Sequence, residues 1–321
     1  MPTTDEQPSL TFGPVPSRRL GRSVGINNVP PKTCSYACAY CQLGRTTRMS
    51  VERAAFHDPN AIFRSVSERL DAADRAGEPV DYLTFVPDGE PTLDLRLGET
   101  IERLRTLRKP IAVITNGSLL SRPDVRDALA GADWISVKVD AVREETWRRL
   151  DRPHKDLELG AIREGLLRFA EGFSGRLVAE TMLVRDVNDR SEEIEGAAAF
   201  VGRLKPAVAY VAAPIRPPAE PWAAVPSQAA LLETHETFAR HVDRVELLIE
   251  YEGDEFAPSG SAERSLLEIT SVHPMRAEAV RALLARTGED WDVVERLIAS
   301  GRLVELDHDG HAFYARRLPG R

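Results

Sequence analysis

Short apolar segments alternate with amphipathic segments along most of this 321-residue chain, and the alternation constrains the fold more than any other feature. Six β-branched, apolar segments have the length of buried strands. Between them, longer segments place apolar residues at helical spacing. Such alternation with short connections predicts an α/β fold with a parallel sheet and right-handed crossovers. The predicted strands are Ser23–Val29, Val80–Val86, Ile111–Thr115, Trp134–Val139, Leu177–Val184 and Val208–Ala213, and the predicted helices cover residues 60–75, 95–107, 160–172, 191–204 and 227–242.

All three cysteines of the chain, Cys34, Cys38 and Cys41, lie within eight residues, and Tyr40 precedes the last of them. Buried structural thiols have no reason to cluster in this way. An odd number of cysteines in a long chain without a secretory signal also does not fit a disulfide framework. Iron–sulfur clusters and structural zinc sites with only protein ligands need four of them, so three cysteines indicate a metal centre with an open position. The alternative is a zinc site completed by a histidine, for which His57 is the nearest downstream candidate.

The Cys-x3-Cys-x2-Cys spacing, with an aromatic residue before the third cysteine, resembles the defining motif of the radical S-adenosylmethionine (SAM) enzymes. The resemblance implies that Cys34, Cys38 and Cys41 bind three irons of one [4Fe–4S] cluster and that SAM chelates the fourth. Reductive cleavage of SAM would then release a 5'-deoxyadenosyl radical that abstracts hydrogen from a substrate. A ferredoxin- or flavodoxin-type electron donor is implied as well. For residues 10–250 the resemblance implies a partial (β/α)6 TIM barrel, which the six strand–helix units match.

Polar residues at the carboxyl ends of the predicted strands are candidates for cofactor binding, because the active site of a parallel α/β fold forms there. The segment 87–91, Pro-Asp-Gly-Glu-Pro, resembles the family's Gly-Gly-Glu-Pro segment, which holds the methionine amino group of SAM; Asp88 replaces its first glycine. A polar residue on the fifth strand binds the cofactor in the family, although a structural hydrogen bond is the alternative here. The predicted cofactor-binding residues are Gly89, Glu90, Pro91, Asn116, Ser136, Asp140 and Glu180.

Lys138 is the candidate catalytic residue. Because strand residues alternate between faces, Ser136, Lys138 and Asp140 share one side of their strand, which is predicted to face the barrel lumen. A buried ammonium needs a partner, and Asp140 is the nearest in sequence. The alternatives are therefore a plain internal ion pair and a role on the carboxylate of the substrate or cofactor.

Arginines lie in two segments near the predicted site. Residues 12–27 resemble a subgroup related to the wyosine-type tRNA-modifying radical enzymes, but no cysteine precedes Cys34 for the second cluster that demethylwyosine synthases have. Arg18, Arg19 and Arg22 in that segment, and Arg216 in the proline-rich loop 214–226, are placed to meet an anionic substrate or an electron donor, with plain surface positions as the alternative. The substrate is a small molecule, a protein or a tRNA base.

After the predicted barrel, the sequence no longer shows the alternation of strands and helices. Residues 251–264 are predicted to be a linker, and 265–317 predict three short helices followed by a hairpin around Asp309-Gly310, an order that resembles a winged-helix domain. From Ala262 onward, nine arginines and no lysine oppose ten acidic residues, and the whole chain carries a net charge of −8. Nucleic-acid binders normally have a basic surface, so a role in capping the barrel or binding a protein is favoured.

The ends of the chain and its hydropathy complete the prediction. Residues 1–9 are predicted to be disordered. No segment is apolar and long enough to span a membrane and no signal peptide is present, so a cytoplasmic protein is predicted. Besides the radical enzyme, a non-catalytic iron–sulfur redox sensor acting through the winged helix is an alternative. Glu90 favours the enzyme, because a sensor has no use for an amino-group site.

Overall fold

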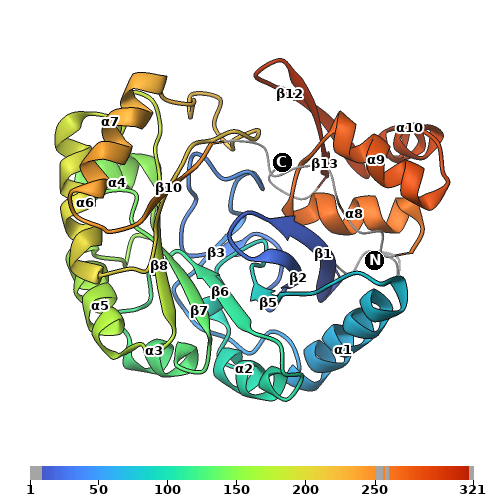
Figure 1. The fold of residues 1–321 in the computed structure, drawn as a ribbon, viewed down its shortest axis with the longest axis horizontal. Helices are drawn as coiled ribbons and strands as arrows, with labels where there is room; N and C mark the ends of the chain where they lie inside the picture. Colours follow the sequence, from blue (N-terminus) through green and yellow to red (C-terminus); the bar gives the residue numbers. More distant parts are fainter. Residues whose placement is uncertain (1–8, 250–255, 257–259, 318–321) are drawn as a thin grey trace.

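The computed structural model describes residues 9–249, 256 and 260–317 of the chain. A curved sheet with the strand order β1-β2-β5-β6-β7-β8-β9-β10 forms its centre, and helices cover the outer face of this sheet (Figure 1). Neighbouring strands run parallel except β1 and β2. The strands of this sheet are β1 (Thr11–Ser17), β2 (Gly21–Ile26), β5 (Tyr82–Phe85), β6 (Ile111–Thr115), β7 (Trp134–Lys138), β8 (Arg176–Met182), β9 (Ala209–Ala212) and β10 (Val245–Leu248).

The α/β barrel-like fold predicted from the sequence is confirmed, and all six predicted strands are present; the bounds of Ile111–Thr115 agree, and those of the other five differ by a few residues. The structure adds two edge strands. β1 contains Pro14 and Pro16, which argue against a strand in general but are tolerated at a sheet edge and at the register shift between Phe12 and Val15. β10 is only partly buried, so its sequence lacks a fully apolar signal.

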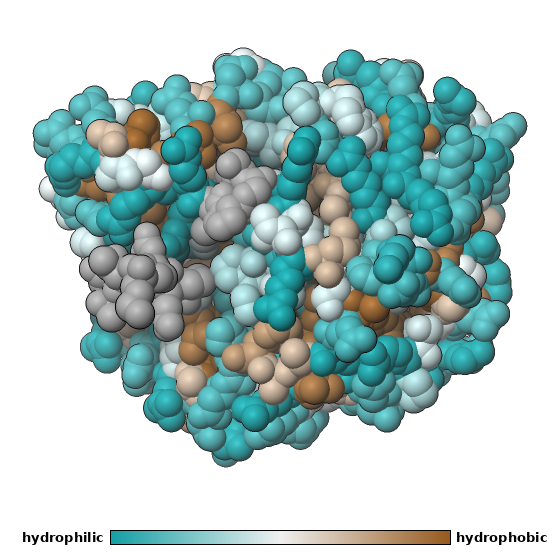
Figure 2. Space-filling model, turned by 180° about the vertical axis from the view of Figure 1, so that it is seen from behind, coloured by the Kyte–Doolittle hydropathy of each residue, from teal (hydrophilic) through white to brown (hydrophobic). Residues whose placement is uncertain are grey.

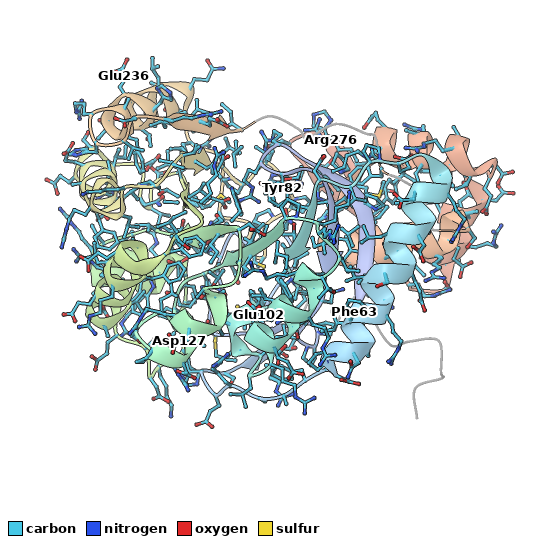
Figure 3. All side chains as sticks on the ribbon, turned by 60° about the horizontal axis from the view of Figure 1, so that its bottom comes forward. Phe63, Tyr82, Glu102, Asp127, Glu236 and Arg276 are labelled. Atoms are coloured by element: carbon cyan, nitrogen blue, oxygen red, sulfur yellow. The ribbon has the colours of Figure 1, made fainter. Side chains whose placement is uncertain are left out.

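Helices connect the parallel strands and form the outer layer. Figure 3 shows Glu102 of α2 and Asp127 of α3 on the outer surface of this layer, where both side chains are exposed, while Tyr82 lies at the sheet. The short helices α3 and α4 were not predicted, because seven residues give too few turns for a periodic pattern. The helices of the barrel are α1 (Pro59–Ala76), α2 (Leu97–Arg105), α3 (Pro123–Leu129), α4 (Glu144–Leu150), α5 (Leu159–Gly172), α6 (Ser191–Leu204) and α7 (Gln228–Ala239), with a 3-10 turn, η1, at Pro91–Leu93.

The two faces of the sheet bury different sets of residues. Side chains such as Ile135 and Val137 pack outward against the helices, in the large core. Trp134, on the opposite face of β7, belongs to a second cluster that fills the base of the lumen. Leu20, from the turn between β1 and β2, is part of this lumen cluster together with Tyr210. The β1–β2 turn therefore reaches into the barrel and brings its neighbours Arg18 and Arg19 with it.

Residues 262–317, here called the C-terminal module, have their own hydrophobic core and a small antiparallel sheet of order β11-β13-β12. The order of helices and strands is that of a winged helix, as predicted, with the short strand β11 in addition. The helix α8 begins at Ala262, with Ser261 as its N-cap, so the last residues of the predicted linker 251–264 are helical. The elements are α8 (Ala262–Val272), β11 (Met275–Arg276), α9 (Ala277–Thr287), α10 (Asp292–Ala299), β12 (Leu303–His308) and β13 (His311–Arg316).

The C-terminal module packs beside β1 and α1 (Figure 1). Arg69 of α1 and Glu268 of α8 form a buried ion pair at 2.9 Å, and Arg69 also donates to the carbonyl of Thr11. His308 of β12 contacts the carbonyl of Pro214 through its Nε2 atom at 2.9 Å. The module is thereby attached both to the side of the barrel and to the proline-rich loop at its mouth.

The face shown in Figure 2 is mostly hydrophilic, with apolar residues scattered over it rather than gathered in one patch. In the described part of the chain, none of the helices combines the length and the apolar character that a membrane crossing requires. Residues 1–8, 251–255 and 257–259 lie outside the described residues, so the predicted disorder of the N-terminus and most of the predicted linker 251–264 are not described.

Candidate active site

The cysteine loop, residues 34–44, lies at the mouth of the barrel and begins at the end of the two-residue strand β3 (Thr33–Cys34), which pairs with β4 (Arg48–Met49). Backbone hydrogen bonds attach it to the end of α4: Ala37 donates to the carbonyl of Asp151 at 3.1 Å, and Ala39 to that of Leu150 at 2.8 Å. All three cysteines are reduced thiols of intermediate exposure. The loop is therefore a backbone-supported segment that presents three thiols.

The thiols are electrostatically coupled to one another. Burial raises the pKa of Cys34 and of Cys38, and the charges of Glu90 and Asp151, respectively, add to the rise; the neighbouring cysteines contribute further. A metal binds the thiolate, so loading this loop displaces protons from it. Among the described residues, no group of three or more His, Cys, Asp or Glu side chains surrounds a single ion site. In a four-iron cluster each cysteine binds a different iron, so its ligands need not converge on one point.

The segment 87–91 is bound directly to the start of the cysteine loop. Glu90 donates its backbone N–H to the carbonyl of Thr33 at 3.0 Å, and Lys32 donates its own to the carbonyl of Asp88 at 2.6 Å. A Cβ atom at Gly89 would lie 2.1 Å from the Thr33 carbonyl oxygen, so only glycine fits there. The structure also explains the departure at Asp88, whose carboxylate pairs with the ammonium of Lys32 at 3.2 Å; both side chains are buried.

Glu90 joins the carboxyl ends of β5 and β6. Its Oε1 atom accepts from the backbone N–H and the hydroxyl of Thr92 and from the hydroxyl of Thr115 at 2.6 Å; its Oε2 atom accepts from the backbone N–H of Asn116 at 2.8 Å. Burial raises the pKa of Glu90, and the four hydrogen bonds oppose the rise. This carboxylate thus has a structural task that the sequence did not reveal, because two of its four donor groups, those of Thr115 and Asn116, come from another part of the fold.

Asn116 contacts the cysteine loop. Its Nδ2 atom lies 3.7 Å from Sγ of Cys34 and 2.9 Å from Oγ of Ser35, and its Oδ1 atom accepts from the backbone N–H of Ser118. Ser35 in turn pairs with the hydroxyl of Ser118 at 2.7 Å. The side chain predicted to bind the cofactor is therefore placed on the first cysteine, where an N–H donor modifies the electronic properties of a bound thiolate.

On the opposite side of the cysteine loop, the Tyr40 hydroxyl donates to Asp140 and lies 3.2 Å from Asp151. The Nζ atom of Lys138 lies 4.7 Å from the centre of the Tyr40 ring and 3.5 Å from the carboxylate of Asp140. Burial, followed by the negative charge of Asp140, raises the pKa of Asp151 well above its usual range. The tyrosine before the third cysteine is thus held by two carboxylates and a cation.

Lys138 and Glu180 form an ion pair at 3.1 Å, and Arg19 binds the other oxygen of the same carboxylate. Burial alone would raise the pKa of Glu180, but Arg19 and Lys138 hold it at about 2. Burial alone would lower the pKa of Lys138, but Asp140 and Glu180 raise it well above its usual value. The predicted ion pair with Asp140 is present at 3.5 Å, and Glu180 is a second partner that the sequence did not predict. Lys138 is therefore a charged ammonium held by two carboxylates.

A cavity of about 260 Å³ lies between the cysteine loop, β7, β8 and the proline-rich loop. Of the predicted site residues, it is lined by Cys41, Lys138 and Glu180, and by the arginines Arg18, Arg19 and Arg216. Ser136 is buried, and among the described residues its hydroxyl has no hydrogen-bond partner. The predicted residues thus form two groups: one lies beside Cys34, and the other lies on the Cys41 side of the loop, where the cavity is.

Sequence reasoning missed Asp151 and Gln42. Asp151 follows α4, which was not predicted, and no motif marks it. Gln42 directly follows the third cysteine, and its position in that loop was the available signal. Its Oε1 atom accepts from Arg216 at 2.8 Å, and its Nε2 atom donates to the carbonyl of Val272 at 3.1 Å.

Comparisons with known proteins agree with this geometry. The family model described as the radical SAM superfamily matches residues 28–200. The chain is 43% identical over 315 residues to a UPF0026 protein of Methanocaldococcus jannaschii, covering 98% of both proteins. It is 34% identical over 202 residues to a UPF0026 protein of Helicobacter pylori, covering 62% of this chain and 64% of that protein. The crystal structure of a radical SAM methyltransferase from Sphaerobacter thermophilus superposes with a TM-score of 0.53 at 18% identity, covering 71% of this chain and 66% of that one, a likeness of fold alone.

Proposed function

We propose that Cys34, Cys38 and Cys41 hold one [4Fe–4S] cluster that, with SAM, generates a radical at the mouth of this barrel, because the chain belongs to the radical SAM superfamily. It is an enzyme of that superfamily whose substrate is unidentified. When bound, the cluster supplies one electron that splits SAM into methionine and a 5'-deoxyadenosyl radical, which takes a hydrogen atom from the substrate. The observation that carries the proposal is the loop of three reduced thiols beside a lumen cavity, supported by backbone hydrogen bonds.

The residues beside Cys34 support the proposal through hydrogen bonds. Because the Glu90 carboxylate already accepts from Thr92, Thr115 and Asn116, we assign it to positioning the 89–91 segment. The backbone of Gly89, Glu90 and Pro91 would then hold the methionine amino group of SAM. Asn116 holds Cys34 and acts on the cofactor only through it.

The residues beside Cys41 are proposed to face the cofactor and the substrate. Lys138 serves as a fixed positive charge, since its raised pKa makes it a poor general base. Glu180 keeps that ammonium in place, and Asp140 holds both the ammonium and Tyr40. The hydroxyl of Ser136, buried in the lumen wall, is proposed to bind the cofactor.

Two partners complete the proposal. A radical SAM enzyme needs a reductant, and we propose a ferredoxin or flavodoxin as the physiological one. A tRNA base is the alternative substrate to a small molecule or a protein. It is suggested by the resemblance of residues 12–27 to the wyosine-type enzymes and by the arginines of that segment at the cavity.

The test is production of 5'-deoxyadenosine. The protein is reconstituted anaerobically with iron and sulfide, reduced with dithionite and mixed with SAM, and the nucleoside is measured by mass spectrometry. We expect formation by the wild type and by the control Ser67→Ala on α1, and none by Cys38→Ala. A wild-type protein with a fully loaded cluster that leaves SAM intact would contradict the proposal.

A further inference from the structure

Lys32 has a backbone conformation and an environment that are both unfavourable for a lysine. Its φ angle of 61° lies in the left-handed region, which favours glycine, and the residue is only 2% exposed. Burial of an ammonium removes its hydration, which is a second cost. The backbone alone would therefore favour glycine at position 32, so the lysine side chain has to contribute something that glycine cannot.

The ion-pair partner of Lys32 is also buried. The Nζ atom lies 3.2 Å from Oδ1 of Asp88, which is 6% exposed. A buried ion pair is weak evidence for stability, because the attraction between the charges is offset by their loss of hydration. Glycine stands in place of Asp88 in the family's Gly-Gly-Glu-Pro segment, so the fold of that segment does not require a charge. Stability alone therefore does not explain the pair.

The pair lies at the junction between the start of the cysteine loop and residues 87–91. The backbone N–H of Lys32 crosses the same junction and donates to the carbonyl of Asp88 at 2.6 Å. The carbonyl of Lys32 accepts from the N–H of Arg48 in β4 at 2.9 Å. Lys32 is thus bound through its N–H, its carbonyl and its ammonium, and two of these three groups contact Asp88.

This junction adjoins both parts of the proposed cofactor site. Lys32 is two residues before Cys34, and Asp88 directly precedes Gly89. Gly89 packs against the carbonyl of Thr33 so closely that a Cβ atom would collide with it. A displacement of residue 88 would therefore move residues 89–91 relative to the first cysteine.

We propose that the Lys32–Asp88 ion pair fixes the backbone of residues 89–91 relative to Cys34, which makes Lys32 and Asp88 positioning residues for the amino group of SAM. This inference rests on the proposed function, because it assigns two further residues to the same site. Both side chains act through the backbone between them. Such positioning matters for a ligand site, since a displacement of about 1 Å can cost up to about 100-fold in rate.

The experiment compares three variants by two measurements. Lys32→Met removes the ammonium, and the double variant Lys32→Gly/Asp88→Gly removes both charges and suits the φ angle at position 32. The control Arg69→Met/Glu268→Leu removes another buried ion pair, the one between α1 and α8. Equilibrium dialysis under anaerobic conditions gives the affinity of each reconstituted holoenzyme for SAM. Mass spectrometry gives the hydrogen exchange of residues 87–93 in the cluster-free proteins.

We expect Lys32→Met to weaken SAM binding at least about tenfold, because the buried Asp88 carboxylate loses the ammonium that it faces and the junction shifts. The double variant should weaken SAM binding about threefold to tenfold, because the segment loses order without gaining an unbalanced charge. Hydrogen exchange of residues 87–93 should be faster than in wild type in both variants. The KM for SAM should rise while kcat stays within about twofold, as expected when only binding is lost. The control should change none of these quantities, and the double variant keeps the test decisive if Lys32→Met does not load a cluster.

Three results would overturn the inference. The first is a double variant that binds SAM as tightly as wild type, because the pair would then serve packing alone. The second is unchanged hydrogen exchange of residues 87–93 in both variants. The third is an equal loss of SAM affinity in the control, which would make the effect a general one of buried ion pairs. A loaded wild type that binds SAM without cleaving it would instead count against the proposed function alone, and one that binds no SAM would count against both.

Discussion

The two sides of the cysteine loop differ in chemistry. Beside Cys34, the carboxyl ends of β5 and β6 form a dense set of hydrogen bonds, in which Glu90 alone accepts four. Beside Cys41, β7 and β8 present the charged residues Lys138 and Glu180 to an open cavity. The polar groups of the first side are paired within the protein, whereas the second side borders a cavity that is lined by charged side chains.

This difference indicates that the two sides of the cysteine loop have different roles. Buried polar groups that are fully paired specify one local structure, and removing one member leaves its partners unsatisfied. Charged groups that line a cavity can bind a ligand that enters it. Substitutions beside Cys34 should therefore affect stability and the cluster, and substitutions beside Cys41 should affect ligands and the response to pH.

Glu90→Ala should have the broadest effect, because it should lower both stability and cluster content. It leaves the hydroxyl of Thr115 and the backbone N–H of Asn116 without their buried acceptor, at about 1–3 kcal/mol for each unsatisfied group. Urea unfolding should show a loss of about 3 kcal/mol and a lower cluster content after reconstitution. Glu102→Ala, on the exposed face of α2, should change stability by less than about 0.5 kcal/mol (Figure 3). Equal effects of the two substitutions would contradict the assignment of Glu90.

Glu180→Gln should change the acid dependence of stability. The pKa of Glu180 is about 2 in the folded chain against an ordinary 4.5, so its contribution is complete above pH 4.5 and is lost as the pH falls toward 2. Across that window the carboxylate gives a slope of up to about 1.4 kcal/mol per pH unit, which the variant should lack.

Urea midpoints between pH 2.5 and 7 test this expectation in the cluster-free protein, because acid dissolves iron–sulfur clusters. The two proteins should differ most at neutral pH and converge near pH 2. Glu164→Gln, in the exposed pair with Arg168, serves as the matched control and should stay within about 1 kcal/mol of wild type at every pH. Parallel pH profiles of wild type and Glu180→Gln would show that Arg19 and Lys138 do not hold the pKa of Glu180 below its ordinary value.

Asn116→Ala should shift the reduction potential of the cluster. An N–H donor to a thiolate favours the reduced, more negative cluster, so losing the contact with Cys34 should lower the potential. A hydrogen bond of about 1 kcal/mol corresponds to roughly 40 mV for one electron. Potentiometric titration followed by EPR measures the shift. Ser118→Ala, which removes the bond to Ser35 but leaves the Asn116 side chain, should shift the potential less; the reverse order would refute the role of Asn116.

Ser136→Ala should have the smallest effect on stability. Its hydroxyl is buried without a partner among the described residues, so its removal should be neutral or slightly stabilising, by up to about 1 kcal/mol. The informative measurement is the affinity for SAM, because removing a hydroxyl that binds the cofactor should weaken that affinity several-fold. Unchanged SAM affinity would remove Ser136 from the cofactor site.

The sequence predicted best what local patterns determine. The spacing of Cys34, Cys38 and Cys41 identified the family, and period-2 alternation on β7 correctly placed Lys138 on the inner face of the barrel with its carboxylate partner Asp140. The apolar segments predicted the parallel strands because buried strands are nearly continuous apolar runs.

The sequence could not predict contacts that depend on tertiary folding. Lys32 and Asp88 lie 3.2 Å apart across a long separation in sequence, and this pair accounts for the one residue that departs from the family segment. The hydrogen bonds from Thr115 and Asn116 to Glu90 likewise arise only when β5 and β6 lie side by side. β1 escaped prediction because prolines within it are compatible only with an edge position.

The measurement that tests the central claim most directly is EPR of the dithionite-reduced cluster with and without SAM, in wild type and in Cys38→Ala. The account predicts a [4Fe–4S] signal in wild type that changes when SAM is added, because a cluster on three cysteines has an iron at which SAM can bind, and no such signal in the variant. A loaded wild-type cluster whose spectrum is unaffected by saturating SAM would contradict it.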